Sequence, residues 1–142
     1  MALPKHLRLE FVTPERSLVH DDVDEVELPG EDGYLGVLPG HTPLLAALKV
    51  GAMWYRKGNE KHFAFISDGF AEVLPDRVSI LAQVAERAED IDLQRAEAAK
   101  RRAEEILAKP SGVADIDFER ARIALLRALT RLQVSRYTRT RT

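Results

Sequence analysis

The sequence of 142 residues contains no cysteine and no long hydrophobic segment. Without cysteine, the protein has no disulfide framework, no thiolate metal ligand and no cysteine nucleophile. No apolar run approaches the roughly 20 residues that span a bilayer, so direct membrane insertion is not expected. The first residues, MALPKHLRLEF, carry charges too early for the apolar core of a secretory signal. We therefore expect a soluble intracellular protein.

Motifs for catalysis and for metal binding are also missing from the sequence. The four histidines are scattered, and none forms the i, i+4 helical pair that is typical of zinc sites. There is no G-x-x-x-x-G-K-[ST] loop and no G-x-S-x-G nucleophile elbow, so neither a P-loop ATPase nor a serine hydrolase is predicted. The acidic run from Asp21 to Glu27 lacks the mid-loop glycine of an EF-hand and is interpreted as a solvated strand edge. We expect no catalytic residue and no bound metal.

Charge is unevenly divided between the two parts of the chain. Residues 1–90 carry nine Lys and Arg against sixteen Asp and Glu, a net charge of −7. Residues 91–142 carry twelve against seven, a net charge of +5. Such a split indicates two modules with different partners. The basic part has only Phe118 and Tyr137 for base stacking, so no nucleic acid partner is expected.

Up to about residue 85, short segments alternate apolar and polar residues as half-buried strands do, for example Leu7, Leu9 and Phe11. Turn signals separate these segments at intervals of about ten residues, which is typical of an antiparallel β-sandwich or barrel. Gly58-Asn59 predicts a tight hairpin, and residues 67–69 (Ser-Asp-Gly) are interpreted as a hairpin turn or a strand end. The other signals are Pro29-Gly30, Pro39-Gly40 and Pro75-Asp76.

After Ala85 the hydrophobic period becomes that of a helix. A first helix is expected after an N-cap at Asp90 or Asp92, and its apolar face is rich in alanine. The segment Pro-Ser-Gly at 110–112 breaks this helix at about the length of a helix–helix connection.

A second helix is expected after a cap at Asp115 or Asp117. Its apolar residues follow the 3-4 spacing of a coiled-coil seam and are Phe118, Ala121, Leu125, Ala128 and Leu132. The fold class predicted is α+β, an N-terminal antiparallel β-sheet domain in residues 1–87 followed by a C-terminal antiparallel two-helix hairpin in residues 88–142. Two helices bury little area alone, so the hairpin is a candidate moving part.

Three segments of the chain carry a resemblance to a known family. GEDGYLGVLPGHTPLLAALKVG, FISDGFAEVLPDRVSILA and DIDLQRAEAAKRRAEE occur in this order before the second helix. Together they resemble the ε subunit of F-type ATP synthases over nearly the whole chain, and the core L-G-[apolar]-x-P-G-H-x-P-L-L is the specific motif. The resemblance implies that the strand domain is a β-sandwich and that the chain is a non-catalytic subunit of a proton-translocating ATP synthase.

The resemblance further implies that the sandwich joins the rotating γ subunit to the membrane c-ring and couples proton flow to ATP synthesis. The complex would lie at the cytoplasmic face of a bacterial plasma membrane. Docking is implied for Glu31, Asp32 and Tyr34, with His41 beyond them. Many relatives carry a carboxylate at the position of Tyr34, so an aromatic contact is expected here in place of an ion pair. The alternative is that the glycines and prolines of residues 33–45, which surround this surface, only shape the sandwich.

A regulatory ATP site on the hairpin, without a magnesium requirement, is also implied by the resemblance. The motif [IL]-D-x-x-R-A is matched in full by residues 91–96. Arginines at i, i+4 repel each other unless an anion bridges them, and guanidinium groups suit phosphate oxygens. The alternative is a solvated basic face. The residues implied are Glu86, Ile91, Asp92, Arg95, Ala96, Arg102, Arg127 and Arg131.

From Glu119 onward the chain carries seven arginines and a single acid. The resemblance implies that this helix, with Arg120, Arg122 and Arg136, can extend along γ, contact the α/β catalytic head transiently and inhibit ATP hydrolysis. A contrasting hypothesis is a free-standing β-sandwich enzyme or nucleic-acid-binding module with a basic helical arm. The missing catalytic constellation and the missing stacking aromatics argue against it.

Overall fold

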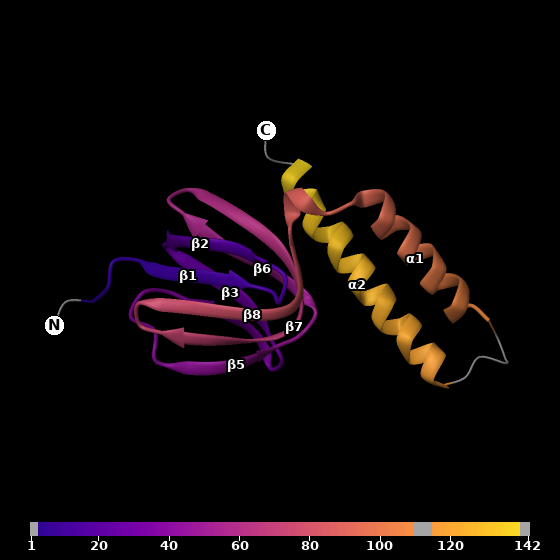
Figure 1. Ribbon diagram of the computed structural model, residues 1–142, viewed down its shortest axis with the longest axis horizontal. Coiled ribbons are helices and arrows are strands. Elements are labelled where there is room, and N and C mark those ends of the chain that lie inside the picture. The colour runs from indigo at the N-terminus through magenta and orange to yellow at the C-terminus, as the bar shows by residue number, and fades with distance from the viewer. Residues whose placement is uncertain (1–2, 110–114, 140–142) are drawn as a thin grey trace. The chain divides into compact units, whose positions relative to one another are not determined.

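The computed structural model describes residues 3–109 and 115–139 (Figure 1). The chain divides into two compact units, Met1–Arg87 and Ala88–Thr142. The first unit is built of strands, and the helices belong to the second. The predicted fold class is confirmed as a β-sandwich followed by two helices.

Eight strands form the N-terminal unit. They pair in the order β2-β1-β8-β7-β5-β3-β4, and β6 pairs with both β3 and β7. The predicted hairpin at Gly58-Asn59 is confirmed, because Lys57 pairs with Glu60 across it. The strands are β1 (Leu7–Val12), β2 (Ser17–Val23), β3 (Glu25–Gly30), β4 (Gly33–Val37), β5 (Leu44–Leu48), β6 (Gly51–Lys57), β7 (Glu60–Leu74) and β8 (Arg77–Arg87).

The sequence predicts a wholly antiparallel sandwich, but one pair of strands departs from this. Strands β1 and β8 run parallel, with Leu9 opposite Val78 and Phe11 opposite Ile80. A short turn forces its two strands to run antiparallel. Because β1 and β8 lie at opposite ends of the unit in sequence, no local turn sets their relative direction.

The core of the sandwich is formed by the inward-facing residues of these strands. Leu7, Leu9 and Phe11 are completely buried, as their alternation predicts. They cluster with apolar residues of the other strands, among them Val26 and Ile80. Burial of large apolar side chains contributes about 1.5–3 kcal/mol each, so this cluster is the main source of stability.

Strand β7 is fifteen residues long and changes its partner near the middle. Its first half pairs with β6 up to Ile66, and its second half pairs with β5 from Gly69. Asp68, at the change, has a φ of 56°. The predicted turn or strand end at 67–69 is therefore wrong. The Asp-Gly pair supplies a bend at which one continuous strand exchanges β6 for β5 as its partner.

The C-terminal unit consists of the 3₁₀ helix η1 (Ala88–Asp90) and the helices α1 (Leu93–Leu107) and α2 (Asp115–Arg139). Figure 1 shows α1 and α2 side by side in antiparallel directions. Their contact is made by small residues, since Ala96, Ala103, Ala121 and Ala128 are all buried. Small side chains let two helix axes approach closely. None of these helices, the only ones in the described residues, is long and apolar enough to cross a bilayer.

Two details of the predicted hairpin can be compared with the structure. The N-cap of α1 is Asp92, one of the two residues predicted. Phe118, predicted in the seam, is 46% exposed. It lies in the first turn of α2, before Ala121, the first buried alanine of that helix. Asp115 and Asp117 both lie within that turn, so the predicted cap of the second helix at one of them is wrong. The predicted break at 110–112 lies outside the described residues.

Candidate docking and ligand-binding surfaces

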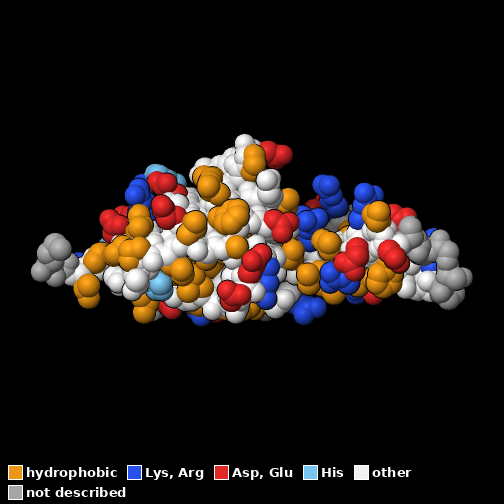
Figure 2. All heavy atoms as spheres, turned by 90° about the horizontal axis from the view of Figure 1, so that it is seen from below, with side chains coloured by type: hydrophobic (Ala, Val, Ile, Leu, Met, Phe, Trp, Pro, Cys, Tyr) orange, Lys and Arg blue, Asp and Glu red, His pale blue; other side chains and the backbone are white. Residues whose placement is uncertain are grey.

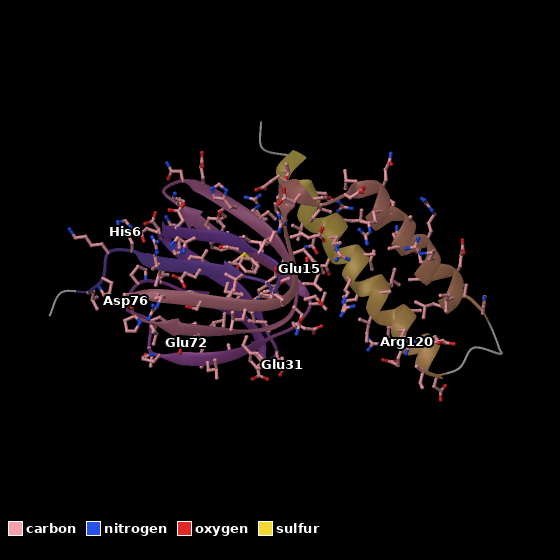
Figure 3. The ribbon with its side chains drawn as sticks, in the orientation of Figure 1. His6, Glu15, Glu31, Glu72, Asp76 and Arg120 are labelled. Atoms are coloured by element: carbon pink, nitrogen blue, oxygen red, sulfur yellow. The ribbon has the colours of Figure 1, made fainter. Side chains whose placement is uncertain are left out.

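The turn between β3 and β4 carries the residues for which docking is implied. Glu31 and Asp32 are exposed at this turn, and Tyr34 follows as an exposed residue of β4. Figure 3 shows Glu31 projecting outward from the strand unit. The backbone N–H of Glu31 donates to the carbonyl oxygen of Ala47 at 3.0 Å, which ties the turn to β5. The two carboxylates are thus presented from a fixed backbone.

The side chain of Tyr34 lies close to the start of β6. A Cβ atom at Gly51 would lie 3.5 Å from the Tyr34 hydroxyl and 2.6 Å from the Cβ atom of Pro29. Pro29 is also the cross-strand partner of Tyr34. The absence of a side chain at Gly51 therefore leaves room for Pro29 and lets the tyrosine ring approach the sheet.

His41 lies in the next loop, after β4, and is half-buried. Its backbone N–H donates to the carbonyl oxygen of Leu38 at 3.1 Å. Its Nδ1 atom lies 2.7 Å from the carbonyl oxygen of Thr42. A carbonyl oxygen only accepts, so Nδ1 carries a proton, and Nε2 is the ring atom left to meet a partner.

An apolar patch on three adjoining strands was not predicted from the sequence. Leu45 on β5, Phe70 on β7 and Leu81 on β8 are 71%, 57% and 62% exposed. Phe70 lies opposite Leu81 on one side and opposite Ala47 on the other. Since Leu45 and Ala47 share a face of β5, the three large side chains form one surface, the apolar patch. Figure 2 shows hydrophobic side chains at the surface of the strand unit.

The signal for this patch lies in runs that break the alternation of polar and apolar residues. "LLAAL" at 44–48 and "SILA" at 79–82 are apolar on both faces of their strands. The strands of a sheet with one solvated face normally alternate apolar and polar residues. A strand that is apolar on both faces therefore indicates that a partner covers its outer face.

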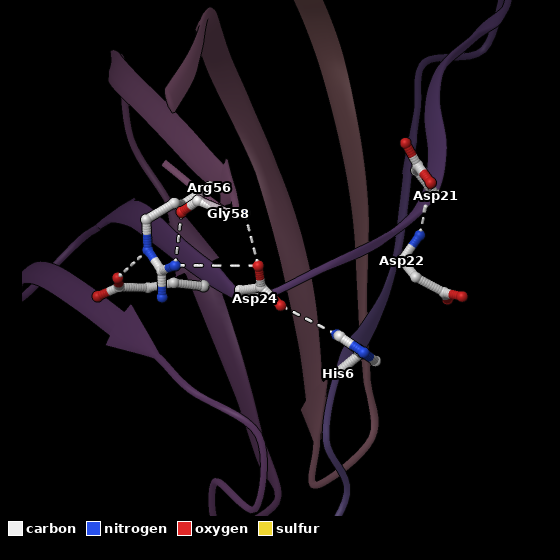
Figure 4. A network of polar contacts seen from close by, with 7 residues as sticks. His6, Asp21, Asp22, Asp24, Arg56 and Gly58 are labelled. Atoms are coloured by element: carbon white, nitrogen blue, oxygen red, sulfur yellow. Dashed lines mark hydrogen bonds and ion pairs between the residues drawn. The ribbon is translucent and has the colours of Figure 1, made fainter. Parts of the chain in front are cut away.

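A polar network joins the acidic run to neighbouring strands (Figure 4). Asp24 accepts from the backbone N–H of Gly58 at 2.7 Å, and its other oxygen lies 2.9 Å from Nδ1 of His6. The bond from Gly58, followed by that from His6, holds the pKa of Asp24 below its ordinary value. Arg56 donates to Glu25 at 3.1 Å. The network thus fastens the β6–β7 hairpin to the segments before β1 and β3.

The acidic run is only in part a strand edge. Asp21 and Asp22 lie on β2, at the end of the pairing order, whereas Glu25 and Glu27 lie on β3, which is paired on both sides. The Nζ atom of Lys57 lies 2.5 Å from Asp21 and lowers the pKa of this carboxyl. In residues 3–109 and 115–139, no three His, Asp or Glu side chains are grouped to hold a metal ion.

The residues implied in ATP binding are distributed over both units. Glu86 lies near the end of β8, in the strand unit. Ile91 and Asp92 lead into α1, and the carboxylate of Asp92 accepts from the backbone N–H of Arg95 at 3.1 Å. Ala96 is buried in the helix seam.

The four arginines implied in ATP binding lie on the two helices. Arg95 and Arg102 are exposed on α1, and Arg127 and Arg131 are half-buried on α2. Residues seven apart share a helix face, as do residues four apart. Each helix thus presents a pair of guanidinium groups.

A groove of about 900 Å³ lies between the first half of α1 and the second half of α2. None of the eight residues implied in ATP binding, all of which the structure describes, lines this groove. The lining residues are Leu93, Gln94, Glu97, Lys100 and Arg101 of α1 and Leu129, Leu132, Gln133, Ser135 and Arg136 of α2.

The arginines implied in inhibition differ in their contacts. Arg122 forms an ion pair with Glu119 at 3.0 Å, and this contact lowers the pKa of Glu119. Arg120 and Arg136 are exposed, and Figure 3 shows Arg120 near the start of α2. The single acid of this segment therefore neutralises Arg122.

Two family models match the chain. The model described as ATP synthase, Delta/Epsilon chain, beta-sandwich domain matches residues 6–88. The model described as ATP synthase, Delta/Epsilon chain, long alpha-helix domain matches residues 89–136. Together they span both units of the structure.

Similar proteins carry the name ATP synthase epsilon chain. One from Nitratidesulfovibrio vulgaris (strain DP4) is 47% identical over 132 residues, covering 93% of this chain and 97% of its own length. One from Desulfosudis oleivorans is 57% identical over 106 residues, covering 74% of this chain and 80% of its own length.

Two solved structures share the fold. One, of the Euglena gracilis mitochondrial ATP synthase, OSCP/F1/c-ring in rotational state 1, matches with a TM-score of 0.77 and 24% identity, over 89% of this chain and 79% of that chain. Another, of the Tetrahymena thermophila mitochondrial ATP synthase central stalk/c-ring, matches with a TM-score of 0.56 and 13% identity, over 98% of this chain and 100% of that chain. At these identities the likeness concerns the fold alone.

Proposed function

Because the chain belongs to the ATP synthase delta/epsilon family, as a non-catalytic subunit of that complex, we propose that it works in the rotating central stalk. Its strand unit docks on the γ subunit and on the c-ring, and it couples proton flow to ATP synthesis. The complex places it peripherally at the cytoplasmic face of a bacterial plasma membrane. The two structures similar in fold are of ATP synthase assemblies that include the c-ring, which supports this choice of partners.

The apolar patch of Leu45, Phe70 and Leu81 is the observation that carries the docking proposal. Large contiguous apolar surfaces are uncommon on monomers and mark interaction sites. The three side chains project from β5, β7 and β8, which are fixed by continuous pairing. We assign the γ subunit to this patch, because a permanent interface within a complex is more apolar than a transient one.

The turn with Glu31, Asp32 and Tyr34 is assigned to the c-ring. Its exposed groups are two carboxylates and one aromatic ring, which suit polar and cationic side chains of a partner loop. The family resemblance implies a carboxylate at the position of Tyr34 in many relatives, so the ring would replace one ionic contact with an aromatic one.

Co-purification tests the docking proposal. Phe70→Ser and Leu81→Ser should each prevent the full-length chain from forming a stoichiometric complex with γ. Both side chains are already exposed, so the fold should persist. Leu38→Ser is the matched control, since Leu38 is equally apolar and 55% exposed but lies in the loop after β4. Normal complexes with both patch variants would refute the assignment.

For the helical hairpin we propose regulation. Nucleotide bound by Arg95, Arg102, Arg127 and Arg131 favours the folded hairpin, and the released α2 contacts the catalytic head and inhibits hydrolysis. The pairs of exposed and half-buried arginines on the two helices support this proposal. A ligand shifts such an equilibrium only as far as it binds one state more tightly than the other.

A further inference from the structure

Strand β4 lies at one end of the sheet, and the proposed function makes no use of its backbone edge. It pairs with β3 and with no other strand of the described residues. Free edges of sheets bind further strands, and natural proteins protect them with charged residues, proline or bulges. At the other end, β2 carries Asp21 and Asp22, and its pairing with β1 contains a register shift. β4 has none of these protections.

Hydrogen bonds on the neighbouring strand show which backbone groups of β4 point outward. Pro29 has no N–H, and its carbonyl oxygen accepts at 2.9 Å from Lys49, which follows β5. Pro29 and Tyr34 therefore form a pair without mutual hydrogen bonds, and the N–H and C=O of Tyr34 point away from β3. Backbone direction repeats at every second residue, so the N–H and C=O of Gly36 point the same way. Both residues thus offer a donor and an acceptor at the free edge.

Gly36 is a glycine that the fold of a single chain does not require. A Cβ atom there would meet nothing within 4 Å, and its φ lies outside the left-handed region that favours glycine. A glycine inside a strand weakens the strand and often marks a place where another group approaches closely. Gly36 and Tyr34 are exposed on the same face of β4. The open space at Gly36 can therefore receive a large side chain from an adjoining strand.

We propose that the chain, before it is assembled, forms a dimer in which the β4 strands of two copies pair antiparallel about a two-fold axis at Leu35. In this register Tyr34 of each copy lies opposite Gly36 of the other. The outward N–H and C=O groups of these two residues then bond reciprocally, so that each donor meets an acceptor. Each Tyr34 ring covers the glycine opposite it, a cross-strand arrangement that stabilises edge glycines.

Self-complementarity favours a second copy over any other partner strand. A two-fold contact requires a segment that complements itself. In the proposed register Gly33 also lies opposite Val37, so every side chain of β4 except the central leucine faces a glycine. The antiparallel direction places Glu31 and Asp32 of the two copies at opposite ends of the contact, where their carboxylates are screened from each other.

The dimer is expected to be weak and reversible. Leu35 is half-buried at the edge of its own core, and pairing would complete its burial. Pairing of one five-residue strand covers far less than the roughly 1,200–2,000 Å² of a stable interface. Because Tyr34 is also assigned to the c-ring, dimer and ring would compete for it. The dimer would thus cover the free edge only until assembly, a role beyond the proposed function.

Sedimentation equilibrium of the full-length chain tests the proposal. Wild type should pass from monomer to dimer as its concentration rises. Gly36→Glu should raise the dissociation constant at least about tenfold, because it removes the space for the Tyr34 ring and makes the new carboxylates of the two copies diagonal neighbours. Tyr34→Ala should act in the same direction. Gln83→Glu adds the same charge at an exposed position of β8 and should leave the dimer unchanged. Circular dichroism checks that each variant is folded.

Single cysteines test the register, because the chain contains none of its own. Opposite residues of a pair without mutual hydrogen bonds have Cα atoms about 4.5 Å apart, which is within the range of a disulfide. Leu35→Cys should therefore form a disulfide-linked dimer on mild oxidation. Leu38→Cys is the matched control, since Leu38 is 55% exposed. At about 3.4 Å per residue, its two copies would lie about 20 Å apart across the axis.

Three results would overturn the proposal. They are a wild-type chain that stays monomeric up to millimolar concentration, a dimer as strong in Gly36→Glu as in wild type, and a disulfide formed by Leu38→Cys but not by Leu35→Cys. The experiment uses the isolated chain, without γ or the c-ring. Failure of the dimer is therefore distinguishable from failure of the stalk function.

Discussion

Asp92 and Arg95 are joined by a hydrogen bond of 3.1 Å from the backbone N–H of Arg95 to the carboxylate of Asp92. The bond makes Asp92 the N-cap of α1. Both residues also belong to the motif that the family resemblance connects with ATP. Part of what this motif does is therefore local, because it fixes where α1 begins whether or not a nucleotide is bound.

Replacing the cap should destabilise the hairpin in the absence of nucleotide. Asp92→Ala removes the acceptor for an otherwise unpaired N–H and should cost about 1 kcal/mol. Asp92→Asn should be nearly neutral, since asparagine caps helices equally well. Urea unfolding followed by circular dichroism measures both variants. Asp92→Asn thus serves as the control, and equal losses for alanine and asparagine at position 92 would contradict the cap.

Nucleotide binding by the predicted arginines can be measured on the isolated chain. Arg95→Ala or Arg127→Ala should weaken ATP binding at that site by about 1.5–3 kcal/mol, the scale of a charge-assisted hydrogen bond. Binding should persist when EDTA removes magnesium, because in the part of the chain that the structure describes no three His, Asp or Glu side chains are grouped to hold a metal ion. Calorimetry gives both results. A wild-type chain that binds no ATP at millimolar concentration would discard this site.

Gly69, the glycine of the bend in β7, should tolerate no side chain. A Cβ atom there would lie 2.2 Å from the carbonyl oxygen of Leu81, which is fixed in β8. Gly69→Ala should cost at least about 1–3 kcal/mol, since the backbone must shift. Gly36→Ala is the control, because a Cβ atom there meets nothing within 4 Å. Thermal unfolding should separate the two variants, and similar midpoints would show that the close approach is not real.

The stability of the sandwich should depend on pH through Asp24. Its pKa in the fold is lowered from 3.8, chiefly by the N–H of Gly58 and then by His6. A lowered folded pKa gives stability that is present above pH 3.8 and is lost as pH falls through the folded value. Asp24→Asn should therefore be less stable than wild type at pH 6, with a difference that shrinks below pH 3.8. Urea midpoints at several pH values test this, and a constant difference would exclude ionisation of Asp24 as its source.

Removing α2 should change the assembled enzyme more than the sandwich. Deletion of residues 116–142 should raise the ATP hydrolysis rate of the reconstituted complex, because the proposed contact of the arginine-rich helix with the catalytic head would be lost. Synthesis should change little, since all strands lie before residue 88. Identical hydrolysis with and without the segment, at low and high ATP, would leave only the coupling role.

Local patterns in the sequence predicted the local features of the fold. The alternation of Leu7, Leu9 and Phe11 and the glycine at position 58 each act through a few neighbouring residues, so periodicity and turn chemistry were sufficient. The parallel pairing of β1 with β8 depends on segments far apart in sequence, and no local signal encodes it. Asp68-Gly69 was misread because a positive φ serves a bend within a strand as well as a hairpin turn.

The candidate surfaces were predictable only in part. The turn signal at Pro29-Gly30 lies just before the exposed turn at Glu31, and helix signals offered Asp92 as one of two N-caps for α1. The apolar patch was missed because Leu45, Phe70 and Leu81 come from three strands, and only the register of the sheet brings them together. The groove likewise depends on how α1 and α2 pack, since Arg101 and Arg102 are indistinguishable in the sequence and face different surroundings in the fold.

The continuity of β7 has a mechanical consequence. One uninterrupted main chain pairs with β6 and then with β5, so these two strands are linked through β7 by covalent bonds as well as by side-chain packing. Shear between β5 and β6 would have to distort this backbone or break its pairing, whereas packed side chains alone can slip. Torque applied at β5 would therefore reach β6 with little elastic lag, and the sandwich would turn as a stiff block.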